Sequence, residues 1–168
     1  MIVLETERLI LRELAGRDAG FVVELLADPD FVANIGDRGV RTIEQAEQQF
    51  LRAAWRNYAD HGFGLWLVET RGDTVPVGIC GMLQRAWLDH PDLGYAFVPE
   101  GRGQGYALEA ARGVIDWAAA RAIAPVVAIV KPGNDRSLAI LDRIGFVSRG
   151  TTMGPDGAGP PVLLLQKE

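Results

Sequence analysis

The chain has 168 residues, 48% of them hydrophobic and 23% charged, so one domain spanning 1–168 with a sizeable core is expected. This composition is ordinary for globular proteins and excludes disordered and fibrous classes. The formal net charge of -5 argues against nucleic acid as a partner, because binding a polyanion usually needs clustered Lys and Arg.

The first third of the chain is expected to form one strand and two helices. Leu9 to Leu14 has the composition of a strand. From Asp18 to Ala27 apolar residues recur at helical spacing, and Asp28-Pro29 is expected to end that helix. Thr42 is the expected N-cap of a second helix, rich in Glu, Gln, Ala and Arg, that runs to about Ala59.

The remaining elements alternate between strands and helices. Three strands come first, the first two joined into a hairpin by Arg71-Gly72-Asp73: Phe63 to Thr70, Val75 to Gln84 and Leu93 to Val98. They are followed by a helix, a strand, a helix and two strands: Gly103 to Arg121, Val126 to Val130, Ser137 to Ile144, Phe146 to Thr151 and Val162 to Gln166. About seven strands and four helices in this order predict an α/β domain with a mixed sheet.

The segment Arg102-Gly103-Gln104-Gly105-Tyr106-Ala107 carries the functional signal, because it leads from a strand into the long helix. The first amides of a helix lack internal partners, and the helix dipole adds partial positive charge there. Glycines let an anion approach the backbone, and Arg102 adds a permanent charge. These features predict a pyrophosphate cradle, although a tight strand-to-helix turn would use the same glycines.

Two other phosphate-binding loops do not match this segment. A Walker loop ends in Gly-Lys-Ser or Gly-Lys-Thr, whereas Gly105 is followed by Tyr106 and Ala107. The dinucleotide fingerprint Gly-x-Gly-x-x-Gly also fails, because Tyr106 or Leu108 stands where the third glycine is required.

The loop and its surroundings resemble the GCN5-related N-acetyltransferases (GNAT). Arg102-x-x-Gly105-x-Ala107, after Val98-Pro99-Glu100, is similar to the acetyl-CoA signature of that family. Further segments resemble the branch that contains the acetyltransferases of ribosomal-protein N-termini: Glu5 to Arg12, Val77 to Gly81, Leu93 to Glu100, Gly105 to Ala110 and Asn134 to Phe146. The resemblance implies a GNAT-like single domain, α/β (α+β), whose mixed sheet is mostly antiparallel.

The resemblance also implies acetyl-CoA as cosubstrate. Backbone groups of a splayed strand would pair with its pantetheine, a role that falls on Tyr95, Ala96, Phe97 and Val98. The pyrophosphate would lie on Arg102, Gly103, Gln104, Gly105, Tyr106 and Ala107. Asn134 would contact the cofactor as well as cap the helix after it, and Lys131 and Arg136 would reach the adenosine phosphates.

Three residues are candidates for catalysis under this resemblance. The amide of Phe97 would face the acetyl carbonyl as an oxyanion donor. Asp92 matches the carboxylate of a family Glu-x-Gly pattern and would act as base through a water, unless it is only a turn residue. Leu141 stands where many relatives carry a Tyr, so Ser137 is the candidate proton donor to the thiolate, with a helix first-turn role or donation by water as alternatives.

Other features of the sequence limit the possible bound metals, disulfides and cellular location. The only cysteine, Cys80, is expected to be a small buried hydrophobe, and one cysteine excludes an intramolecular disulfide and a thiolate zinc site. No metal is expected. The absence of a signal-peptide pattern and of a membrane-length apolar run indicates a cytoplasmic protein without a membrane partner. Dimerisation through edge strands is left open.

The predicted activity is acetyl transfer to a primary amine, and the resemblance makes a protein N-terminal α-amine the first candidate acceptor. A small amine such as a polyamine, an aminoglycoside or an amino-acid derivative is the second. A CoA-binding sensor without catalysis is the third, because the family Tyr is absent at Leu141. Four aromatic residues are candidates to line an acceptor groove or to lie in the core: Phe31, Trp66, Trp87 and Tyr106.

Overall fold

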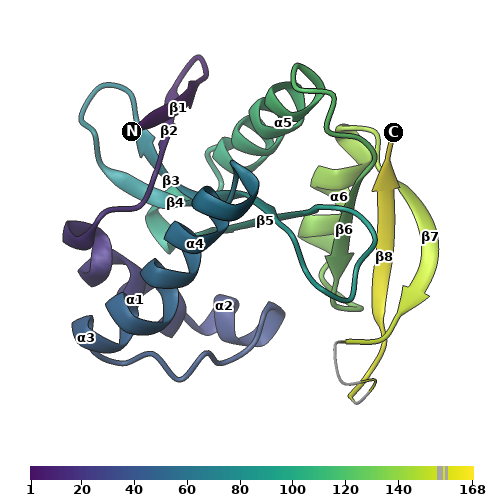
Figure 1. Cartoon of the computed structure of the whole chain (residues 1–168), viewed down its shortest axis with the longest axis horizontal. Helices are drawn as coiled ribbons and strands as arrows, with labels where there is room; N and C mark the ends of the chain where they lie inside the picture. The colour runs from purple at the N-terminus through teal and green to yellow at the C-terminus, as the bar shows by residue number, and fades with distance from the viewer. Residues whose placement is uncertain (155–156, 158) are drawn as a thin grey trace.

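A sheet runs through the molecule, and helices cover both of its faces (Figure 1). The computed structural model describes residues 1–154, 157 and 159–168, and eight strands form within that part of the chain. The strands are β1 (Ile2–Glu5), β2 (Leu9–Arg12), β3 (Leu65–Thr70), β4 (Pro76–Leu83), β5 (Asp92–Phe97), β6 (Val126–Val130), β7 (Val147–Thr152) and β8 (Val162–Lys167).

The helices fall into two groups along the chain. The N-terminal group comprises a 3-10 turn at Gly16–Asp18, α1 (Ala19–Ala27), α2 (Pro29–Asn34), α3 (Ile43–Gln45), a π-helical segment at Ala46–Leu51 and α4 (Arg52–His61). The second group comprises a 3-10 turn at Pro99–Gly101, α5 (Tyr106–Ala119) and α6 (Asp135–Arg143).

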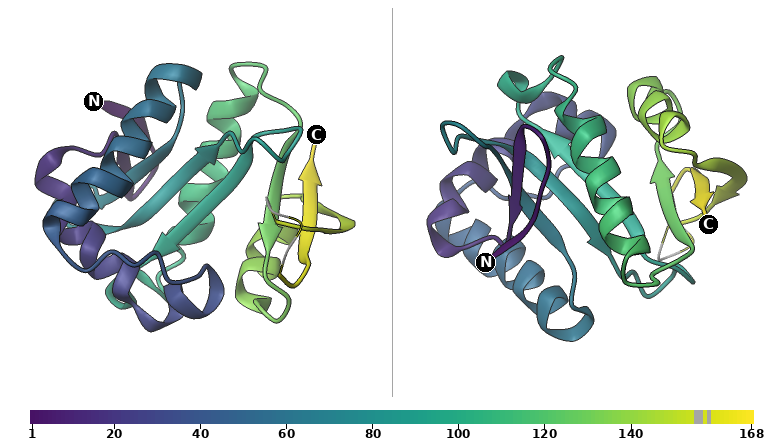
Figure 2. Two further views of the ribbon diagram at one scale, coloured as in Figure 1. Left: turned by 60° about the horizontal axis from the view of Figure 1, so that its bottom comes forward. Right: turned by 90° about the horizontal axis from the view of Figure 1, so that it is seen from above.

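The strands are ordered β1-β2-β3-β4-β5-β6-β8-β7 across the sheet. Every neighbouring pair is antiparallel except β5 and β6, which are parallel. Figure 2 shows β1–β5 as one half of the sheet and β6–β8 as the other, turned away from it. The parallel pair is therefore the seam between two antiparallel halves.

Two apolar clusters hold the helices on the sheet. The cluster on one face joins the N-terminal helices to β3 and β4, with Leu25, Leu51 and Ile79 among its buried members. The cluster on the other face joins α5 and α6 to the sheet and includes Val114, Leu141 and Cys80. Cys80 is fully buried, as expected, and burial raises the pKa of its thiol.

The α/β class and the mostly antiparallel mixed sheet are confirmed, but the prediction of about seven strands and four helices missed two elements. β1 was missed because it is a short edge strand whose only partner is β2. α2 differs from the prediction because Asp28-Pro29 does more than end α1. Asp28 also caps the next helix, accepting from the Phe31 amide at 3.1 Å, with Pro29 in its first turn.

The second predicted helix is continuous from Ile43 to His61 and contains the π-helical turn. Its expected N-cap is confirmed, because the Thr42 hydroxyl accepts from the Gln45 amide at 3.2 Å. Among the residues that the structure describes, no helix combines the length and apolar character needed to cross a membrane.

Candidate functional site

At the seam of the sheet, β5 and β6 separate close to the start of β5. The two strands pair at a single register position, Asp92 with Val127, and the Val127 amide donates to the Pro91 carbonyl at 2.9 Å. A cavity of about 1030 Å³ lies along the opening, bordered by β5, the loop before α5, the end of β6, α6 and α2. This is the largest recess that the expected site residues share.

The backbone of β5 offers free groups at alternate residues. The Val98 amide donates to the Val77 carbonyl at 3.1 Å, and the Val98 carbonyl accepts from the Gly101 amide at 2.9 Å. Because bonding alternates along an antiparallel pair, the amides of Tyr95 and Phe97 face away from β4, toward the seam. Of the four residues expected to meet pantetheine, Ala96 and Val98 therefore donate their amides to β4. Only the amides of Tyr95 and Phe97 are left for a ligand.

The loop before α5 presents unpaired amides to the same cavity. Gly103 and Gly105 have φ angles of 71° and 78°, in the left-handed region that favours glycine. Within the described part of the chain, the amides from Gly103 to Leu108 have no hydrogen-bond acceptor, and the first bond of the helix runs from Glu109 to the Gly105 carbonyl at 3.1 Å. Most of the expected loop residues line the cavity: Arg102, Gly103, Gly105, Tyr106 and Ala107.

Gln104 is the loop residue that does not line the cavity. Its carbonyl instead accepts from the Arg8 guanidinium at 2.9 Å. Arg8 also pairs with Glu109 at 2.7 Å and lies over the Tyr106 ring, 4.9 Å from its centroid. Arg8 therefore fixes the loop against α5, a role that no motif or spacing in the sequence indicates.

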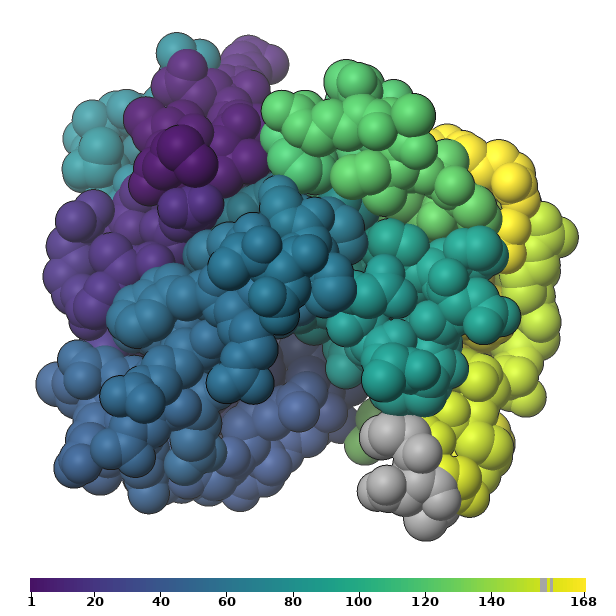
Figure 3. Space-filling model, viewed as in Figure 1, coloured from purple at the N-terminus to yellow at the C-terminus, as the bar shows by residue number. Residues whose placement is uncertain are grey.

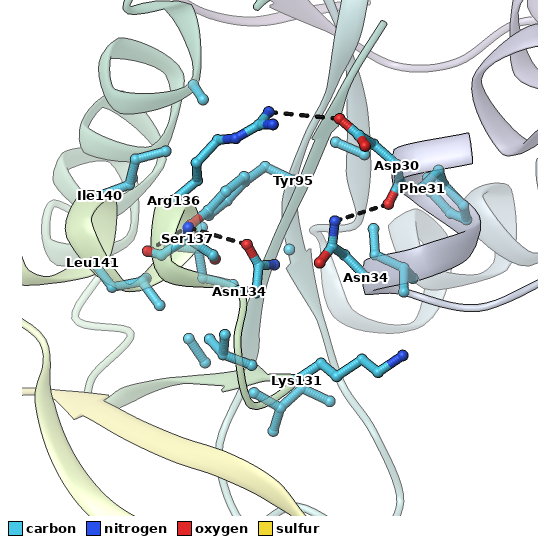
Figure 4. A pocket seen from close by; sticks show the side chains of 18 of the residues that line it. Asp30, Phe31, Asn34, Tyr95, Lys131, Asn134, Arg136, Ser137, Ile140 and Leu141 are labelled. Atoms are coloured by element: carbon cyan, nitrogen blue, oxygen red, sulfur yellow. Dashed lines mark hydrogen bonds and ion pairs between the residues drawn. The ribbon is translucent and has the colours of Figure 1, made fainter. Parts of the chain in front are cut away.

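The cations expected to meet phosphates are engaged by α2. Arg102 forms ion pairs with Asp28 and, at 3.1 Å, with Asp30. Arg136 lies 3.5 Å from Asp30, and the Lys131 ammonium donates to the Ala33 carbonyl at 2.7 Å. Figure 4 shows α2 facing α6 across the cavity, with the Arg136–Asp30 pair spanning it. Burial opposes ionisation of Asp28, yet the hydrogen bond and charge of Arg102 hold its pKa below the ordinary value.

Asp92 opens β5 and is 1% exposed. Its Oδ2 accepts from the Arg85 Nε at 2.6 Å, whereas Oδ1 is buried without a partner among the described residues. Burial raises the pKa of Asp92, and the charge of Arg85 opposes that effect only in part. Asp92 is thus a strand residue at the cavity wall rather than a turn residue, and Arg85 is a partner that the sequence did not suggest.

Two hydroxyl groups meet at the start of α6. The Tyr95 hydroxyl lies 2.7 Å from the Ser137 Oγ, and burial raises the pKa of Tyr95 to about 12. The expected cap is confirmed, because the Asn134 Oδ1 accepts from the Ser137 amide at 3.3 Å. Leu141, where many relatives carry a Tyr, is buried. Figure 4 places Tyr95, Asn134 and Ser137 together at one wall of the cavity.

A second cavity of about 430 Å³ adjoins the first. Both are bordered by Gly94, Tyr95 and Ala96 of β5 and by Phe31 of α2. The space-filling view shows the surface hollowed between the blue N-terminal helices and the teal segment that precedes β5 (Figure 3). Of the aromatic candidates, Phe31 lines both cavities and Tyr106 the larger one, whereas Trp66 is buried in the core against Trp117.

Comparisons with known proteins agree with this geometry. A family model described as an acetyltransferase (GNAT) domain matches residues 8–147. YkkB of Bacillus subtilis is 30% identical over 147 residues, 85% of this chain and 84% of its own length. The N-acetyltransferase YoaA of the same organism is 27% identical over 150 residues, 88% of this chain and 84% of its own.

Solved structures share the whole fold. An acetyltransferase from Agrobacterium tumefaciens superposes with a TM-score of 0.84 at 24% identity, covering 100% of this chain and 95% of that one. RimL, the ribosomal L7/L12 alpha-N-protein acetyltransferase, in complex with coenzyme A, gives a TM-score of 0.83 at 15% identity, covering 99% and 97%. At these identities the likeness is one of fold.

Proposed function

The chain belongs to the GNAT acetyltransferase family and is an N-acetyltransferase, and we propose that it moves acetyl from acetyl-CoA to a primary amine by direct attack in a ternary complex. The observation that carries this proposal is the seam of the sheet. There β5 leaves β6 after one register pair, and unpaired amides of β5 and of the loop before α5 border one cavity.

The residues at the seam fit acetyl-CoA. The amides from Gly103 to Leu108 suit a pyrophosphate, and Gly103 and Gly105 allow the positive φ angles that leave these amides unpaired. The amide of Tyr95 suits the pantetheine, and Asn134 lies where it would contact the cofactor in addition to capping α6. Acetyl-CoA supplies the activated acyl group, a thioester that an uncharged amine can attack.

Three side-chain or backbone groups would then perform the chemistry. Asp92 would accept the amine proton through one water, a task that suits its raised pKa. The Phe97 amide would donate to the acetyl oxygen as negative charge develops there. Ser137, held by Tyr95, would protonate the departing sulfur.

The proposed acceptor is a primary amine, and two classes of amine are candidates. RimL acts on a protein N-terminus and shares the fold, which makes a peptide α-amine one class. A small-molecule amine is the other, because the second cavity is small and adjoins β5. A non-catalytic CoA sensor would bind acetyl-CoA but release no thiol with either class.

Two measurements test the proposal. Isothermal titration calorimetry with acetyl-CoA is expected to show saturable binding in the micromolar to millimolar range. Release of free coenzyme A thiol is then followed with small amines and peptides. Binding without thiol release from any amine would support the sensor instead, and no binding at millimolar acetyl-CoA would remove the transferase and the sensor alike.

A further inference from the structure

The second cavity has the size and lining of a small-molecule site. Its volume of about 430 Å³ lies within the range of natural ligand pockets. Its wall includes large apolar side chains from α2 and its C-cap, from the π-helical segment and from β4: Phe31, Ile35, Phe50, Ile79 and Leu83. It meets the larger cavity at Gly94 to Ala96, so a molecule bound in it would present one end to the seam of the sheet.

Two guanidinium groups stand at the junction of the cavities. Arg38 and Arg85 line both of them. Arg85 is neutralised by Asp92 at 2.6 Å. The Arg38 guanidinium, in contrast, forms no hydrogen bond or ion pair with any residue in the described ranges, unlike Arg102 and Arg136 nearby.

Arg38 carries a positive charge that no carboxylate of the described residues pairs. It lies in the connection between α2 and α3 and is open to solvent, but the surrounding protein and the like charge of Arg85 both lower its pKa. An anion at the junction would relieve this repulsion and would find a planar donor fork suited to a carboxylate.

The same charges argue against other acceptors. A polyamine or an aminoglycoside would bring further positive charge to Arg38, the cation of the junction that no carboxylate pairs. A peptide N-terminus presents an uncharged amide where a free amino acid has its carboxylate. The apolar wall, finally, suits a hydrocarbon side chain.

We propose that the acceptor is a small primary amine bearing a carboxylate and an apolar body, as in an apolar amino acid, and that Arg38 selects it by binding the carboxylate. This inference rests on the proposed acetyltransferase function and assigns the substrate class of the same site. Arg38 is thus a specificity residue in the connection between α2 and α3.

Matched acids and amides test the inference. Coenzyme A release is measured with L-phenylalanine, L-leucine and L-methionine and with the amide of each, alongside spermidine and a peptide with a free N-terminus. We expect kcat/KM for at least one acid to exceed that of its amide by about tenfold, which corresponds to ~1.4 kcal/mol. In Arg38→Gln that ratio is expected to fall to about one.

Arg41→Gln is the matched control, because it removes the same charge from the same connection and Arg41 itself lines neither cavity. It is expected to keep the acid preference, and thermal melting of both variants verifies that they fold. Equal rates for acids and amides in the unmodified protein, or an acid preference that survives Arg38→Gln, would overturn the inference. So would faster turnover of the peptide or of spermidine than of every acid.

The two levels of failure are distinguishable. If amides or the peptide are acetylated without an acid preference, only the role of Arg38 is lost and the acetyltransferase function stands. If no compound in the panel releases coenzyme A, the proposed function and the inference fall together.

Discussion

The two adjoining cavities are lined by different kinds of group. The larger one is bordered by backbone amides of β5 and of the loop before α5, with glycines at the turns. The smaller one is bordered mainly by side chains from the connection after α2, the π-helical segment and β4. A site lined by backbone amides can be recognised in the sequence, because its glycines and the start of its helix are consecutive residues. A site lined by side chains from distant segments leaves no such local pattern.

The groups that would bind the cofactor and the groups that would carry out the reaction also lie in different places. Groups that would hold the donor lie at the pyrophosphate end of the larger cavity. The groups that would move protons, Asp92 and Ser137, line the larger cavity only, but each contacts a residue that lines both: Asp92 pairs with Arg85, and Ser137 with Tyr95. Variants at one end should therefore change cofactor affinity without changing turnover, and variants at the junction should do the reverse.

Asp92→Asn should give the largest effect, and the loss should appear in kcat alone. The amide keeps the size of the side chain at the start of β5 but cannot accept a proton, so kcat is expected to fall by about 10²-fold, as for a lost general base. The acetyl-CoA dissociation constant is expected to stay within about twofold. Steady-state kinetics and calorimetry on the same preparation measure both.

The pH profile provides the control for Asp92. A base works only when ionised, and burial raises the pKa of Asp92, so kcat/KM should fall as the pH drops through that raised value. Arg85→Gln removes the charge that lowers this pKa and should move the acidic limb to higher pH. An acidic limb that is unchanged in Asp92→Asn would remove Asp92 from the role of base.

Gly105→Val should give the second largest effect, and the loss should appear in the affinity for acetyl-CoA. A β-branched residue at a φ of 78° is strained by about 1–2 kcal/mol, and its Cβ would meet the Arg8 guanidinium, 3.4 Å away, which holds the loop whose amides would bind the pyrophosphate. The acetyl-CoA dissociation constant is expected to rise about tenfold or more. Gly62→Val, at a φ of 74° after α4, imposes similar strain away from the cavity and should leave that constant unchanged. Equal losses in both variants would mean that strain alone is responsible.

The Tyr95–Ser137 pair should act as one unit at the junction. Tyr95→Phe and Ser137→Ala each remove one hydroxyl of the 2.7 Å contact. Each is expected to lower kcat by about tenfold, less than the roughly 10²-fold of an essential proton donor, because water can substitute. Because the two groups work together, the double variant should be no slower than the slower single variant. Multiplying losses in the double variant would show two independent roles.

The sequence was informative where neighbours in the chain are neighbours in space. The glycines before α5 and the Asn134 cap before Ser137 are local arrangements, and the structure places them as the pattern indicated. Arg102 shows the limit: in sequence it reads as a phosphate ligand, yet it pairs with Asp28, 74 residues away.

Arg38 and Arg85 show the same limit more strongly. Their positions beside β5 depend on the packing of the N-terminal helices and of the segment after β4, and no periodicity or motif marks them. Likewise, Asp28-Pro29 carries both a helix end and a helix start, and only the Phe31 contact shows that both are used.

Asp30→Asn should give the smallest effect and tests whether α2 competes with the donor for its cations. Asp30 lies 3.1 Å from Arg102 and 3.5 Å from Arg136, and its side chain is partly exposed, so each pair is worth at most ~1 kcal/mol. Asp30→Asn releases Arg136 and leaves Arg102 with Asp28 as its remaining partner, so acetyl-CoA binding should tighten by up to about fivefold, measured by calorimetry at low salt. Glu44→Gln, on α3 and outside both cavity linings, removes the same charge and should leave the affinity unchanged. Weaker binding in Asp30→Asn would instead mean that α2 orients Arg102 and Arg136 toward the phosphates, which would make the N-terminal helices part of the donor site as well as the acceptor site.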